Sequence, residues 1–126
     1  MSTAPGRCCG PISSSATSGR CTAPRAARDS ARARAQAEAE RIVREADERA
    51  AAIRREGAEL AAKVRREANE QADRVVAEAT NPIAKRAAEV AADRIRREGE
   101  SRARQIEEEA GQRATQVETE ARERAN

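Results

Sequence analysis

The chain has 126 residues, of which 37% are charged, and it contains no Phe, Tyr, Trp or His. Without aromatic residues and with few large aliphatic ones, it lacks the side chains that normally fill a globular core. It also lacks His, the side chain that most often exchanges protons in catalysis near neutral pH. We therefore expect no enzymatic activity, no cofactor, no metal site and no small-molecule substrate. The same composition is also typical of a disordered or conditionally folded chain, which remains an alternative.

The formal net charge of +3 is unevenly distributed along the sequence. Residues 1–28 contain four Arg and no acidic residue, whereas residues 29–126 contain 21 basic and 22 acidic residues. Charges that cancel between neighbours do not form the clustered basic surface that a phosphate backbone requires. No aromatic side chain is available to stack on bases. We therefore do not expect nucleic-acid binding.

Residues 1–28 are predicted to form a disordered basic tail rich in Ser, Pro, Gly and Arg, because they hold too few large aliphatic residues to fold. The alternative is a basic arm that contacts an acidic partner. The tail contains all three cysteines, Cys8, Cys9 and Cys21. Their spacing fits no zinc pattern, so we interpret them as incidental thiols or, alternatively, as a site of intermolecular disulfide formation.

The sequence contains neither the apolar run of a secretory signal nor one long enough to span a membrane. We therefore expect a cytoplasmic protein without a transmembrane segment.

An 11-residue unit with the consensus [I/V]-x-R-E-[A/G]-x-x-x-A-x-x repeats from Ala31 to Asn126. Its three apolar positions are separated by steps of four, four and three residues. Three helical turns per unit correspond to about 3.67 residues per turn, so an α-helix carries these positions as one stripe, whereas a strand would scatter them. The repeat predicts an all-α fold: a long, straight or weakly right-handed, coiled-coil-like helix of hendecad type.

We call the stripe the seam and number its three positions within the unit. No seam position is polar, so we predict that the seam is an interaction surface for a second helix. It takes from the first position Ile42, Ile53, Val64, Val75, Ile95, Ile106 and Val117, from the second Ala46, Gly57, Ala68, Ala79, Gly99 and Ala110, and from the third Ala50, Ala61, Ala72 and Ile83. The remaining members of the three positions are alanines: Ala31, Ala35, Ala39, Ala84, Ala88, Ala92, Ala103, Ala114, Ala121 and Ala125.

The outward positions carry Arg and Glu, often with an acidic residue four positions before a basic one, an order that favours a helix. These predicted pairs are Glu40/Arg44, Glu45/Arg49, Glu70/Arg74, Glu98/Arg102, Glu109/Arg113 and Glu118/Arg122. The acidic triplet 107–109 does not indicate a metal or catalytic site, because consecutive helical side chains point about 100° apart.

Two helices are predicted, at residues 30–80 and 82–126, with Asp29 or Ser30 as the first N-cap. The helix break lies at Thr80, Asn81 and Pro82, where the unit has nine residues instead of 11. Pro82 kinks a continuous helix or begins a new one, with Thr80 or Asn81 as its N-cap. The result is a jointed rod or an antiparallel hairpin. The short connection favours the jointed rod.

The repeated [I/V]-x-R-E-A-x-x-x-A units resemble the long helical part of the peripheral-stalk (b-type) subunits of rotary ATP synthases. Those subunits are also rich in Ala, Arg and Glu, follow an 11-residue period and pair as two nearly straight helices, so the resemblance implies a stalk component. The period also resembles that of late-embryogenesis-abundant proteins, which implies a disordered, stress-protective chain that becomes helical on drying. From the residues themselves we expect a non-enzymatic helical rod that pairs through its seam with itself or with another long helix.

Overall fold

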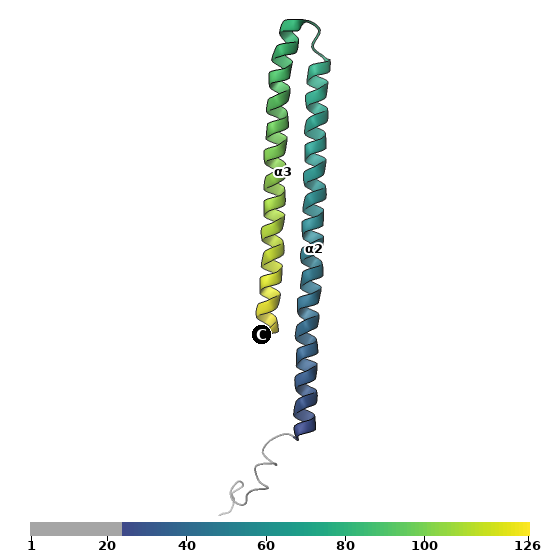
Figure 1. The fold of residues 1–126 in the computed structure, drawn as a ribbon, viewed down its shortest axis with the longest axis vertical. Coiled ribbons are helices and arrows are strands. Elements are labelled where there is room, and N and C mark those ends of the chain that lie inside the picture. The colour runs from purple at the N-terminus through teal and green to yellow at the C-terminus, as the bar shows by residue number, and fades with distance from the viewer. Residues whose placement is uncertain (1–23) are drawn as a thin grey trace, which may run out of the picture. The chain divides into compact units, whose positions relative to one another are not determined.

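The computed structural model describes residues 24–126, which form two α-helices and no strand (Figure 1). Helix α2 spans Arg25–Ala77 and helix α3 spans Pro82–Ala125. The predicted all-α fold with two long helices and a break before Pro82 is thereby confirmed. Most of the predicted tail, including the three cysteines, lies in residues 1–23, outside the described part of the chain.

Helix α2 begins five residues before the predicted start at residue 30 and ends three residues before the predicted end at residue 80. The backbone N–H of Arg28 already donates to the carbonyl oxygen of Pro24 at 3.0 Å, which closes a first helical turn. Arg and Ala at positions 25–28 are strong helix formers and extend the helix toward the N-terminus. Ser30 therefore lies inside the helix, where its hydroxyl accepts a hydrogen bond from Arg34 at 3.1 Å, and the predicted N-cap at Asp29 or Ser30 is wrong.

Asn81 is the N-cap of α3, one of the two residues predicted for that position. Its backbone is extended, with φ −134° and ψ 166°, and its side-chain oxygen accepts a hydrogen bond from the Ala84 N–H at 2.8 Å. Pro82 follows at the first helical position, where its missing N–H would have no intrahelical partner in any case. Local sequence alone therefore explains where α3 begins.

Contacts divide the chain into two units, residues 1–41 and residues 42–126. Within the first unit, residues 25–41 are helical, none of the described residues is buried, and Arg41 forms an ion pair with Glu38. Within the second unit, the remainder of α2 and all of α3 lie side by side and antiparallel (Figure 1).

The second unit is therefore a helical hairpin and not the jointed rod that the short connection favoured. Only residues 78–81 join the two helices. Four extended residues reach about 13 Å, whereas packed helix axes lie about 8–10 Å apart. Connections of two to eight residues are ordinary between antiparallel helices. Small residues at the seam bring the axes close, so four residues are sufficient.

Candidate interaction surface

The two helices approach each other most closely where a glycine faces an alanine. A Cβ atom built on Gly57 would lie 2.4 Å from the Cβ of Ala110, and one built on Gly99 would lie 2.4 Å from the Cβ of Ala68. Real Cβ atoms essentially never approach within 3.0 Å. Glycine is therefore required at both positions because it allows the opposite helix to come this close.

These two contacts fix the register of the hairpin. Moving 11 residues forward on α2 and 11 residues back on α3 converts the Gly57–Ala110 contact into the Ala68–Gly99 contact. The glycine lies on α2 in the first contact and on α3 in the second, and residues 53–57 and 95–99 share the sequence Ile-Arg-Arg-Glu-Gly. The two halves of the hairpin are thus related by an approximate twofold axis.

The hairpin buries only small residues, and every one of them belongs to the second or third seam position. The buried residues are Ala46, Ala50, Gly57, Ala61, Ala72, Ala92, Gly99, Ala103, Ala110, Ala114 and Ala121. Ala68 and Ala79 are half-buried. The alanine and glycine part of the predicted seam is therefore used within the chain, between α2 and α3.

The first seam position is different, because its large side chains are only half-buried. This holds for Ile42, Ile53, Val64, Val75, Ile95, Ile106 and Val117. Ile83, a predicted third-position residue, is 85% exposed. It lies in the first turn of α3, and the register leaves it without a facing turn of α2, which has already ended at Ala77.

The half-buried aliphatic residues line two shallow grooves between the helices, each beside a glycine contact. The first groove, of about 260 Å³, is lined by Ile53, Glu56, Gly57, Leu60, Ile106, Glu109, Ala110 and Arg113. The second, of about 210 Å³, is lined by the residues one unit away, Val64, Glu67, Ala68, Gln71, Ile95, Glu98, Gly99 and Arg102. Both are smaller than the typical 300–1,000 Å³ of small-molecule sites. Repetition along both helices instead suits a long partner with the same period.

A third hollow, of about 440 Å³, lies at the start of α3 and is lined by Pro82, Ile83, Arg86, Ala87 and Val90. All five residues belong to one helix. A small-molecule site buries most of its ligand's surface, which one side of a single helix cannot do. We therefore do not assign a ligand to this hollow.

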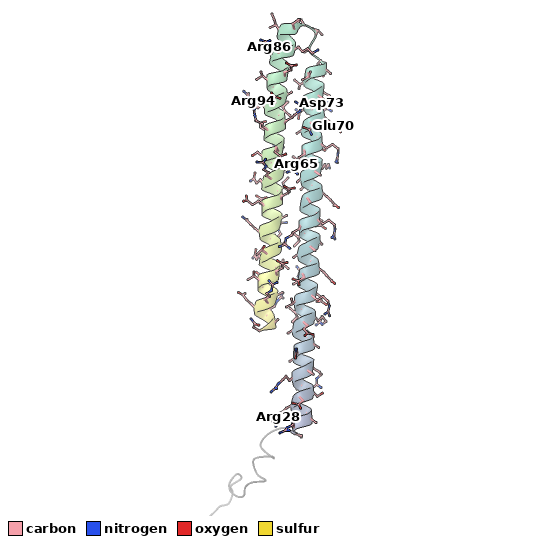
Figure 2. All side chains as sticks on the ribbon, in the orientation of Figure 1. Arg28, Arg65, Glu70, Asp73, Arg86 and Arg94 are labelled. Atoms are coloured by element: carbon pink, nitrogen blue, oxygen red, sulfur yellow. The ribbon has the colours of Figure 1, made fainter. Side chains whose placement is uncertain are left out.

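Arginines on one side of the hairpin form ion pairs between the two helices. Arg54 binds Glu118 at 3.1 Å, and Arg96 binds Asp73 at 2.8 Å. In Figure 2, Arg65 lies beside α3, where it binds both Glu100 at 2.9 Å and Glu107 at 3.1 Å. Arg65 therefore holds two carboxylates that lie two turns apart on α3.

These hydrogen bonds shift the titration of the carboxylates. Hydrogen bonds from Arg65 lower the pKa of both Glu100 and Glu107 below the ordinary glutamate value, and the hydrogen bond from Arg54 lowers that of Glu118. Arg104 lowers the pKa of Glu100 further. A lowered carboxyl pKa means that the native hairpin favours the ionised form.

The ion pairs and the grooves lie on opposite sides of the buried seam. Successive helical residues are about 100° apart, so the Arg54 side chain points about 100° away from Ile53, with the buried Gly57 and Ala61 in between. Glu56 lies about 60° from Ile53 in the other direction. We call the side with the ion pairs the paired face, and the side with the first-position aliphatic residues and the grooves the open face.

The charged residues that line the grooves of the open face have no partner within the described residues, 24–126. They are Glu56, Glu67, Glu98, Glu109, Arg102 and Arg113. Two of the predicted helical pairs, Glu98/Arg102 and Glu109/Arg113, are therefore not formed. A third, Glu118/Arg122, gives way to the hydrogen bond from Arg54. The open face thus combines half-buried aliphatic residues with unpaired charges.

Neither metal ligands nor membrane spans are found in the described part of the chain. Among residues 24–126, no three acidic or cysteine side chains converge as metal ligands would. Neither α2 nor α3 has an apolar stretch of the length that crossing a membrane requires.

Comparison of the chain with protein-family models, with curated proteins and with solved structures finds no match.

Proposed function

We propose that this protein is a non-enzymatic helical rod or stalk that associates through its open face with a long, apolar-striped helical partner. The division of the seam supports this proposal most directly. Its Ala and Gly positions are occupied within the hairpin, whereas seven large aliphatic residues at the first position remain half-exposed. Half-exposed Ile and Val that recur every 11 residues on one face suit another helix with that period.

A coiled-coil-like scaffold also agrees with the chemistry of the described residues. The grooves are too small for an ordinary ligand, and the charged residues either pair across the hairpin or lie in the groove walls. The resemblance to peripheral-stalk subunits contributes a role to this proposal, that of a stiff spacer between other components. The chain would then act by its length and by what it holds.

A stress-protective, conditionally disordered protein is the second candidate, and the composition favours it. The chain is 37% charged and has no aromatic residue, and such chains often lack the buried surface needed to remain folded in dilute solution. The hairpin itself buries only alanine and glycine between its helices.

Circular dichroism in dilute buffer distinguishes the two candidates. A rod gives a strongly helical spectrum that melts cooperatively, because α2 and α3 contain 53 and 44 residues. A coil spectrum that becomes helical only in trifluoroethanol or on drying would refute the rod and support the stress-protective chain. Protein concentration must be measured without absorbance at 280 nm, since the chain has no Trp or Tyr.

A further inference from the structure

We infer that the partner of the open face is a second copy of the hairpin, aligned so that α3 of each copy packs over α2 of the other. This inference rests on the proposed function and adds the identity and orientation of the partner. Two independent features of the open face support it: the spacing of its aliphatic residues and the distribution of its unpaired charges.

The spacing requires a partner with the same repeat. Ile53 and Val64 on α2, like Ile95 and Ile106 on α3, are 11 residues apart and lie beside successive grooves. A partner that fills both grooves must present aliphatic side chains at the same interval on two antiparallel helices. A second hairpin does so without any adjustment, because its own open face has this spacing.

The charges determine which helix lies over which. In the grooves, α2 contributes acidic residues only, Glu56 and Glu67, while α3 contributes Arg102 and Arg113 in addition to two glutamates. Packing α2 over the partner's α2 would oppose like charges, which is unfavourable. Packing α3 over the partner's α2 instead brings the arginines of one copy to the glutamates of the other.

The register places these charges at matching heights. Gly57 lies opposite Ala110, so Arg113, three residues further along the antiparallel α3, is level with position 54. That level is two residues, or about 3 Å, from that of Glu56. Arg102 and Glu67 have the same relationship one unit away. When two hairpins face each other with their connecting loops at the same end, Arg113 lies near the partner's Glu56.

Charge reversal tests both the partner and the orientation. One variant carries Glu56→Arg and Glu67→Arg, and a second carries Arg102→Glu and Arg113→Glu. We expect the unaltered protein to sediment as a dimer and each variant alone to associate at least about tenfold more weakly, because like charges then face each other. A one-to-one mixture restores both sets of opposite charges and should form a heterodimer with nearly the original affinity.

The matched control is Glu59→Arg with Glu70→Arg, which changes the same charges on the same helix. Neither Glu59 nor Glu70 lines a groove, and both are exposed, so this variant should dimerise like the unaltered protein. Circular dichroism of every variant must remain helical, which separates loss of association from loss of folding.

The contrary outcomes are distinct. A helical protein that stays monomeric at the highest attainable concentration overturns the second copy as partner but leaves the proposed rod, whose partner would then be another protein. A dimer whose mixed variants fail to reassociate overturns the orientation. A coil spectrum in dilute buffer overturns the proposed function itself.

Discussion

Gly57 and Ala110 face each other so closely that a methyl group on Gly57 would lie 2.4 Å from the Cβ of Ala110. Ala110 cannot yield by rotating its side chain, because its Cβ is fixed to the backbone. We expect Gly57→Ala to push the helices apart and to destabilise the hairpin by about 1–3 kcal/mol, as overpacking of a close contact does. Thermal unfolding followed by circular dichroism measures the change.

Two further variants give this measurement its controls. Gly111→Ala introduces a methyl group with no atom within 4 Å, so it should stabilise the helix by about 0.5–1 kcal/mol through propensity alone. Combining Gly57→Ala with Ala110→Gly exchanges the two residues, an arrangement that Ala68 and Gly99 already adopt, and should recover most of the lost stability. If Gly57→Ala proved as stabilising as Gly111→Ala, the close contact would be wrong.

The seam illustrates how far the sequence could predict this fold. The 11-residue pattern placed Gly57 and Ala61 on one stripe, and both are buried. Asn81 was correctly among the predicted N-caps because capping is a local property. A repeat pattern defines the face that is buried but does not say which helix covers it. The choice between rod and hairpin was therefore open, and reasoning from the short connection favoured the wrong one.

The cross-helix ion pairs could not be predicted for the same reason. Arg65 and Glu107 are 42 residues apart in sequence and come together only through the register of the hairpin. Sequence rules for helical pairs extend over three or four residues, so they assigned Glu118 to Arg122 and missed Arg54. Leu60 was also missed as a groove residue, because it lies one turn beyond the second seam position and outside the stripe.

Acidification should destabilise the hairpin through Arg65. The pKa values of Glu100 and Glu107 are lowered in the native state, so as pH falls through the ordinary glutamate range the unfolded chain takes up protons first. Their stabilising contribution is therefore complete above that range and is lost as pH falls through the lowered native values. We expect the melting temperature to decrease between about pH 6 and about pH 3.

Arg65→Gln isolates this contribution. Without the guanidinium, the pKa values of both carboxyl groups should return toward the ordinary value, so this variant should melt lower at neutral pH and lose less stability on acidification. Arg66→Gln is the matched control because Arg66 is exposed and has no ion pair. An Arg65→Gln variant with the same dependence of melting temperature on pH as the unaltered protein would show that these ion pairs do not contribute.

Removing the cap of α3 should weaken the turn of the hairpin. In Asn81→Ala the Ala84 N–H loses the side-chain oxygen that it contacts at 2.8 Å, and loss of an N-cap costs about 0.5–2 kcal/mol. Asn81→Asp keeps an acceptor at the same place and should retain nearly all the stability. Chemical denaturation of the three proteins measures the difference, and equal midpoints for Asn81→Ala and the unaltered protein would contradict the role of the cap.

Restoring the 11-residue step at the break should convert the hairpin into a long continuous helix. Inserting two Ala after Thr80 and replacing Pro82 with Ala removes the proline and brings the stripes of both helices onto one face. A continuous helix cannot fold back on itself, so two extended chains should pair and form the Gly57–Ala110 contact between molecules. The hairpin and the pair of extended helices then use the same seam contacts.

Fluorescence energy transfer within one chain follows this conversion. Labels at the exposed Glu59 and Glu108, with the three cysteines replaced by Ser, lie at the same level of the hairpin. In the continuous helix they would be about 75 Å apart at 1.5 Å per residue. Labelled chains diluted into an excess of unlabelled protein should therefore transfer efficiently in the native hairpin and hardly at all in the variant.

Pro82→Ala without the insertion is the control for this experiment. It keeps the nine-residue step, which turns the second stripe by about half a turn relative to the first, so a continuous helix would carry its two stripes on opposite faces and the hairpin should persist with high transfer. If the inserted variant also kept high transfer, the spacing at the break would not determine the reversal, and the contacts between α2 and α3 alone would hold the hairpin closed.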